Sequence, residues 1–231
     1  MTARQLHHDQ TAAAEGTRRS LDGWARRWVW ALPVWGALLA ISTVTHQPDY
    51  KTDFGGYADY ITTVPFLISH IFASIGGAVL GVVGAVALAI GLAATPGVRT
   101  ALRGLVAFVA AQVLMTAGFA VAAFFQPAIG RAFQDGHDAV ARDINSDVYG
   151  PELFAMIGVG LVLFIVGAAL LGHAANRSGV VPVWGGRLFA LAAPAFAVAG
   201  FSIEILQPVA GLLLAAASVV LARAVSAGDQ R

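Results

Sequence analysis

Cysteine is absent from the 231 residues and charged residues are scarce, with Asp, Glu, Lys and Arg together forming only 12% of the chain. Without cysteine there is no disulfide bond, no thiolate metal ligand and no cysteine nucleophile. A soluble domain carries about twice this fraction of charge, so the chain has too few charges to cover a surface that faces water. These deficits exclude disorder along the whole chain, a coiled coil and a nucleic-acid-binding domain.

Apolar residues take the place of the missing charges. They make up 58% of the chain and give it a mean hydropathy of +0.73. A helix that crosses a bilayer needs about 20 apolar residues. Three stretches of this length contain no charge, a fourth is shorter, and a fifth is long enough for two helices separated by a turn: 64–94, 105–125, 153–172, 28–44 and 180–225. The pattern predicts an all-α integral membrane protein, a six-transmembrane-helix bundle.

The distribution of charge predicts the orientation of these spans. With six spans both termini lie on one side, and Lys and Arg concentrate on the cytoplasmic side of a membrane. The two tails and the even-numbered loops hold eleven of the fourteen basic residues, whereas the odd-numbered loops hold nine of the thirteen acidic residues. The two sides therefore carry net charges of +7 and −6. This difference predicts an N-in/C-in topology, with the acidic side facing outward.

Three segments follow from this topology. Residues 1–23 are polar and lack hydrophobic periodicity, which predicts a disordered cytoplasmic tail. Residues 24–225 are predicted to form the six-span membrane domain, and residues 226–231 a short cytoplasmic tail. No small-residue cleavage site follows the first apolar stretch, so we expect a retained helix rather than a signal peptide.

Small residues recur on one face of the second predicted span. In lipid, small side chains allow two helix backbones to approach closely, and this approach stabilises the helix pair. His70 lies seven residues before the first of these glycines and therefore shares their face on an ideal helix. The predicted packing residues are Gly77, Gly81, Gly84 and Gly91.

Polar side chains within the apolar spans are candidate functional groups, because such groups are costly in a membrane and usually face the bundle interior. Five of them are interpreted as a solute path or a proton-linked site: His70, Gln112, Thr116, Gln126 and Glu204. The alternative interpretation is structural. In it, His70 is a neutral imidazole bonded to Ser74 or to a neighbouring carbonyl, and Glu204 is an interfacial side chain.

Imidazoles on the outer side provide a second hypothesis. His46, His70 and His137 lie on or near that side, and imidazole together with carboxylate suits zinc, copper or iron. The chain has no H-x-x-x-H or H-E-x-x-H spacing to support such a site. Metal binding is therefore the weaker interpretation of these residues.

The third predicted loop, 127–151, contains four apolar residues at helical spacing among its acids. This pattern is typical of a short amphipathic helix on the outer membrane surface, and the alternative is a solvated acidic loop. The apolar residues are Ile129, Phe133, Val140 and Ile144.

No catalytic motif is present in the sequence: it has neither a phosphate-binding glycine loop nor a nucleophile elbow. The ratio of 13 Arg to one Lys is typical of a GC-rich bacterial genome. We therefore expect a non-enzymatic, multi-pass protein of a bacterial plasma membrane that passes a small solute or supports a membrane complex, without a cofactor. The alternative is a metal- or redox-dependent membrane enzyme that uses the outer histidines. Apart from the lipid bilayer, the expected partner is another membrane protein or a second copy of the chain, and not nucleic acid.

Overall fold

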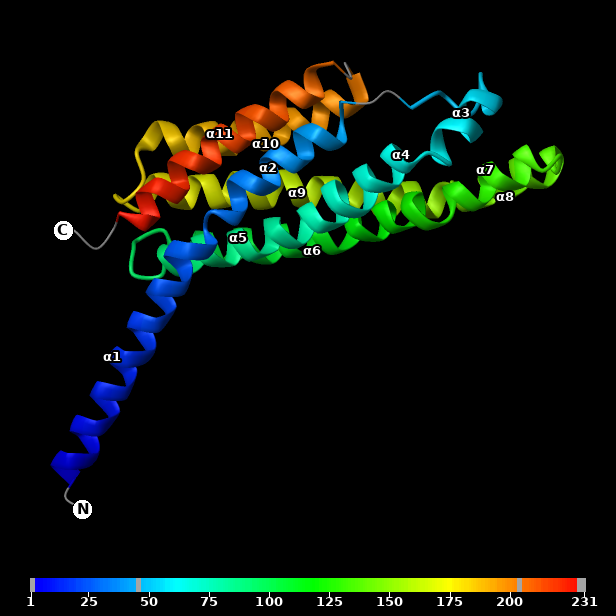
Figure 1. Ribbon diagram of the computed structural model, residues 1–231. Helices are drawn as coiled ribbons and strands as arrows, with labels where there is room; N and C mark the ends of the chain where they lie inside the picture. The colour runs from blue at the N-terminus through cyan, green and yellow to red at the C-terminus, as the bar shows by residue number, and fades with distance from the viewer. Residues whose placement is uncertain (1–2, 45–46, 203–204, 228–231) are drawn as a thin grey trace.

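The computed structural model describes residues 3–44, 47–202 and 205–227, and within these ranges every regular element is a helix (Figure 1). Five stretches are long and apolar enough to cross a membrane, which agrees with an α-helical membrane protein. They are Val64–Gly91, Val98–Gln134, Pro151–Arg177, Val183–Gly200 and Leu206–Ser226. Two of the residues singled out above, His46 and Glu204, lie outside the described ranges.

The N-terminal stretch is helical, where the sequence pattern predicted no regular structure. Helix α1 (Ala3–Trp28) projects away from the other helices in Figure 1. Its alanines and arginines have high intrinsic helix propensity, and Glu15 and Arg19 form an ion pair one turn apart. Local propensity therefore accounts for a helix that an analysis of hydrophobic periodicity alone does not detect.

The first predicted span, 28–44, forms a helix that is shorter than a bilayer is thick. Helix α2 (Ala31–Ser42) has 12 residues, or about 18 Å at 1.5 Å per residue. It follows a break in the helical chain after Trp28, and it packs on α5 (Gly77–Gly91) and α11 (Leu206–Ser226). Pro33 lies in the first turn of α2, where its missing N–H leaves no helical hydrogen bond unmade.

The second span consists of three helical segments in sequence. Helix α4 (Val64–Ile68) continues into a π-helix, η1 (Ser69–Gly76), and then into α5. The side chain of Thr63 caps the start of α4 by accepting a hydrogen bond from the backbone N–H of Phe66. In a π-helix the hydrogen bonds span five residues instead of four, so side chains before η1 are rotated relative to those after it.

The remaining long helices complete the bundle. Helix α6 (Val98–Phe124) packs against α9 (Pro151–Arg177), and α10 (Val183–Ser202), which contains Pro194, packs between α9 and α11. The C-terminal end of α11 and the start of α2 lie at the same end of the bundle in Figure 1.

A small helical layer, which we call the cap, extends beyond the other end of the bundle, past α4 and α6 (Figure 1). It consists of α3 (Phe54–Ile61), α7 (Gln126–Gln134) and α8 (Asp138–Val148) (Figure 1). The cap and α4 share a hydrophobic core separate from that of the rest of the bundle. It is made of Phe54, Tyr57, Ile61, Phe66, Ile129 and Ala141.

The cap replaces the single amphipathic helix that was one of two predictions for residues 127–151. Gly136, with φ of +87°, forms the turn between α7 and α8, a backbone conformation that favours glycine. As a consequence the apolar face is not continuous: Ile129 is buried in α7, whereas Val140 and Ile144 of α8 are exposed. The residues of α8 that face the cap core are Ala141 and Asn145.

Glycines of α5 lie against neighbouring helices. Gly84 contacts the backbone and side chain of Leu32, while Gly77 and Gly81 lie against the indole of Trp35. Gly91 lies against the side chain of Val225 in α11. Three of the four predicted packing glycines, Gly77, Gly81 and Gly84, therefore contact α2, the helix that carries Trp35.

A second close contact, between α2 and α11, has a reciprocal form that the sequence analysis did not single out. A Cβ on Gly36 would lie 2.7 Å from the backbone nitrogen of Ala215, and a Cβ on Gly211 would lie 2.8 Å from the Cα of Ala40. Each helix thus presents a glycine and an alanine four residues apart, and each glycine faces the alanine of the partner helix. The two backbones are in direct contact because neither glycine carries a side chain.

Candidate functional site

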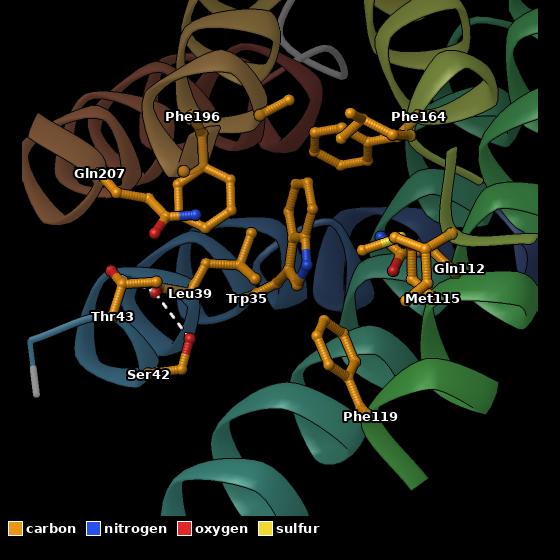
Figure 2. A pocket seen from close by; sticks show the side chains of 14 residues that line it. Trp35, Leu39, Ser42, Thr43, Gln112, Met115, Phe119, Phe164, Phe196 and Gln207 are labelled. Atoms are coloured by element: carbon orange, nitrogen blue, oxygen red, sulfur yellow. Dashed lines mark hydrogen bonds between the residues drawn. The ribbon is translucent and has the colours of Figure 1, made fainter. Parts of the chain in front are cut away.

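A cavity of about 210 Å³ lies inside the bundle between α2, α6, α9, α10 and α11 (Figure 2). It extends from Trp35 and Gln112 in the interior to Ser42 and Gln207 at the helix ends, on the same side of the bundle as the cap. The other lining residues are Leu39, Thr43, Met115, Phe119, Ile157, Leu161, Phe164, Phe196, Ala197 and Gly200.

The indole of Trp35 forms the inner wall of this cavity and is fixed in place by aromatic neighbours. Its ring centroid lies 5.2 Å from that of Phe108 and 6.0 Å from that of Phe164, both with edge-to-face geometry. On the α5 side, a Cβ on Gly81 would lie 3.0 Å from the Trp35 Nε1 atom. The glycine therefore makes the room that the indole occupies.

Gln112 is the buried polar residue of the cavity. The residue is 5% exposed, and its Nε2 atom is buried and has no hydrogen-bond partner among the described residues. The same glycine accommodates it, because a Cβ on Gly81 would lie 3.2 Å from Nε2. A buried amide N–H without an acceptor costs about 1–3 kcal/mol, and because Nε2 is itself buried, this cost is borne by the protein in the described conformation.

The rim of the cavity is polar. The Ser42 hydroxyl donates to the Leu39 carbonyl at 2.8 Å, and the Thr43 hydroxyl donates to the Ala40 carbonyl at 3.0 Å. With their hydrogens used in this way, the two oxygens remain available as acceptors. Gln207 lies at the start of α11 and lines the rim opposite the end of α2 (Figure 2).

The cavity is electrically neutral as far as its described lining is concerned, since none of these fourteen side chains carries a charge. Most of the lining is aliphatic or aromatic, with amides and hydroxyls placed at the two ends. Such a combination of apolar walls and a few polar groups is typical of sites for small molecules.

His70, the first of the candidate solute-path residues, does not line the cavity. Its Nδ1 atom lies 3.0 Å from the Phe66 carbonyl and 3.1 Å from the Ser69 hydroxyl, and its ring packs 4.1 Å from that of Phe66. These partners fit the structural interpretation of a histidine bonded to a neighbouring carbonyl. Ser74, which was considered as a partner, donates instead to the Ser69 carbonyl across the π-helix.

The other members of the predicted path lie apart from each other. Gln112 lines the cavity, whereas Thr116 is half-buried outside the lining set. Gln126 is buried at the start of the cap, where its amide nitrogen donates to the Tyr149 hydroxyl. Glu204 lies outside the described residues. Of the four predicted residues that the structure describes, only Gln112 lines the cavity.

The predicted metal ligands are not brought together in the described part of the chain. No group of three or more His, Asp or Glu side chains among the described residues could hold a metal ion. His137 is exposed at the start of α8, and His46 lies outside the described residues.

Sequence reasoning missed most of the lining of the cavity. Gln207 is brought to Ser42 and Trp35 only because α11 returns along α2, a pairing that depends on the bundle topology. A usable signal exists in hindsight: two helices with a glycine and an alanine four residues apart, Gly36–Ala40 and Gly211–Ala215, are candidates for direct packing.

Comparisons with known proteins add no assignment. No protein-family model, no curated protein and no solved structure matches this chain.

Proposed function

We propose that the protein is a six-span protein of a bacterial plasma membrane, with both termini in the cytoplasm, that takes up a small uncharged solute in the bundle cavity. The observation that carries this proposal is the cavity itself, which has apolar walls, amides and hydroxyls at its two ends and no charge in its described lining. In this scheme α2 completes the sixth crossing, and the protein acts by binding and passing a solute rather than by catalysis. The excess of basic residues on the side of the two tails, and of acidic residues on the other side, supports the orientation.

The orientation can be tested directly because the chain has no cysteine of its own. A single cysteine at exposed His137, in the cap, should react with a membrane-impermeant maleimide on intact bacterial cells. A single cysteine at exposed Ala94, in the turn between α5 and α6, should react only after the cells are permeabilised. The reverse pattern would contradict the proposed topology.

Solute access can be tested with three further single-cysteine variants. Ser42→Cys places a thiol at the rim and Gln112→Cys at the inner end of the cavity, whereas the adjacent Val113→Cys points to the bundle exterior, where Val113 is 63% exposed. Maleimides react with the thiolate, which forms poorly in apolar surroundings. We expect N-ethylmaleimide to modify Ser42→Cys fastest, Gln112→Cys next and Val113→Cys slowest. Equal rates at 112 and 113 would refute an accessible cavity.

A further inference from the structure

Helix α1 leaves the bundle at the end opposite the cap and runs obliquely to the direction of the long helices (Figure 1). We infer that α1 lies on the membrane surface at this end of the bundle, with an apolar stripe buried among the headgroups and its arginines bound to anionic phospholipids. Helix α1 contributes no residue to the described lining of the cavity, so this contact with lipid is separate from the proposed solute site.

One side of α1 carries the apolar stripe. Its members follow one another at intervals of three or four residues, which places them on one side of a helix. They are Ala14, Thr17, Leu21, Trp24 and Trp28. A second series with helical spacing lies on the other side and is charged: Glu15, Arg19, Asp22 and Arg26. The first members of the stripe are small, so the two faces become evident only once α1 is known to be a helix.

The apolar stripe points back toward the bundle. Near the end of α1, Trp24 packs partly against the bundle core, and the neighbouring Ala25 is 1% exposed. One turn earlier, Leu21 lies beyond the core and is 47% exposed. Ala14, Thr17 and Leu21 line a groove between α1 and the C-terminal end of α5. Because α1 projects past the bundle (Figure 1), the same face is directed at the lipid around a bundle that spans a bilayer.

Arginines border the stripe on both sides. At 100° per residue, Arg18 and Arg27 lie about 80° and 100° to either side of the centre of the stripe, and both are exposed. At such positions the aliphatic part of an arginine covers acyl chains while its guanidinium group reaches the lipid phosphates. Helix α1 as a whole contains five arginines and three acids, so its charge complements that of an anionic surface.

Exposed tryptophans mark the level of the headgroups at this end of the bundle. Trp28, Trp30 and Trp184 are all exposed, and tryptophan is enriched at the membrane–water interface. The indole of Trp30 donates a hydrogen bond to the Ser226 hydroxyl at 3.2 Å, which joins the chain before α2 to the end of α11. Helix α1 therefore meets the bundle at the headgroup level, where its stripe can enter the interface.

The small size of the stripe makes the charge of the lipid decisive. Ala14 and Thr17 bury little apolar area, so their hydrophobic contribution to membrane binding is small. An arginine near an anionic membrane surface raises the ratio of bound to free helix roughly fivefold. We therefore expect α1 to lie on a membrane that contains anionic lipid and to leave one made of phosphatidylcholine alone.

The test places the fluorophore NBD on each side of α1, which the absence of native cysteine permits. Thr17→Cys lies on the stripe, whereas Ala12→Cys lies on the charged side and is the matched control. Each labelled protein is placed in nanodiscs of phosphatidylcholine, with or without phosphatidylglycerol, that contain a lipid with a doxyl quencher close to its headgroup. We expect strong quenching only at position 17 and only with phosphatidylglycerol.

Two charge variants of the Thr17→Cys protein test the role of the border. Arg18→Gln removes an arginine beside the stripe and should lower the ratio of quenched to unquenched NBD roughly fivefold. Arg19→Gln removes the same charge from the far side of α1, where Arg19 pairs with Glu15, and should have a smaller effect. Equal effects of the two variants would refute the binding of lipid by the border arginines.

The quenching pattern decides between the possible surroundings of α1. No quenching at position 17 in either lipid would place α1 in water or against another protein, and equal quenching at positions 12 and 17 would exclude the proposed face; either result refutes the inference. Equal quenching of position 17 with and without phosphatidylglycerol refutes the selection of anionic lipid. The maleimide reactivity of Gln112→Cys does not depend on α1, so the lipid contact and the proposed solute site can fail separately.

Discussion

The contact between α2 and α11 should be among the positions at which one added methyl group most strongly destabilises the bundle. In Gly36→Ala the new Cβ lies 2.7 Å from the Ala215 backbone nitrogen and 2.8 Å from its Cα, where an ordinary contact is 3.4 Å or more. These atoms belong to the backbone and cannot rotate away, so the helices must separate. Overpacking of this kind costs about 1–3 kcal/mol.

The steric cost must be separated from the gain in helix propensity that replacing glycine by alanine brings, up to about 1 kcal/mol. Gly158 provides the matched control, because it lies in the long helix α9 and a Cβ there would meet no atom within 4 Å. Gly158→Ala should gain helix propensity without a steric clash at the new Cβ. We therefore expect Gly36→Ala to be less stable than Gly158→Ala by about 2 kcal/mol, or roughly 4–8 °C in Tm.

The assay is thermal unfolding of each purified variant in the same detergent, followed by circular dichroism. Gly211→Ala, which acts at the other end of the contact, should have a similar effect. The double variant should lose less than the two single variants together, because helices already separated by the first methyl group have room for the second. If Gly36→Ala is as stable as Gly158→Ala, the direct backbone contact described here is wrong.

Two further predictions concern the cap. Tyr57 donates a buried hydrogen bond to the Asn145 side-chain oxygen at 3.0 Å. Tyr57→Phe leaves this buried acceptor unpaired and should destabilise the cap by about 1–2 kcal/mol. The expected result is faster hydrogen exchange of the α8 amides with the α9 amides unchanged, and unchanged exchange of α8 would contradict it. Burial raises the pKa of the Tyr57 and Tyr149 hydroxyls above the ordinary value of 10.0. The pKa of each of these tyrosines is higher in the folded chain than in the unfolded chain. The free energy of unfolding is therefore fully retained below about pH 10. It falls as the pH rises above this value, because the unfolded chain releases protons that the folded chain retains. Stability measured by circular dichroism from pH 8 to 11 should fall only at the alkaline end, and less steeply in Tyr57→Phe; an equally steep fall in that variant would exclude Tyr57 as a source.

Hydrophobicity alone was sufficient to predict the long helices, because a bilayer demands about 20 apolar residues of each. The predicted stretches 64–94, 105–125 and 153–172 all fall on long helices of the structure. The same reasoning overestimated the length of the first span, since the break after Trp28 leaves only Ala31–Ser42 in α2. That break has no signature in the hydropathy.

The face of His70 was harder to predict because the argument assumed an ideal α-helix from 70 to 91. The π-helix over Ser69–Gly76 changes the rotation per residue in that interval, so equal spacing no longer means an equal direction. Gly77, Gly81 and Gly84 follow the π-helix, and their direction relative to one another is unaffected by it. The argument from residue spacing is therefore reliable only within α5.

Gln112 was identified as a candidate because an amide within an apolar span is unusual. Its partners in the cavity were not, since Trp35, Phe164 and Gln207 come from helices far apart in the chain. No local pattern specifies which helices become neighbours. The composition of a site assembled from five helices therefore depends on the tertiary packing of the whole bundle.

The shortness of α2 has a consequence for the surrounding lipid. Helices α6 and α9 each have 27 residues, whereas α2 has 12. A membrane adapts to a short hydrophobic segment by becoming locally thinner, at a cost of fractions of a kcal/mol per ångström. Acyl chains beside α2 should therefore be compressed relative to those on the opposite flank. Such an uneven lipid boundary would make the protein more stable in bilayers of shorter-chain lipids, and would concentrate it in the thinner regions of a mixed membrane.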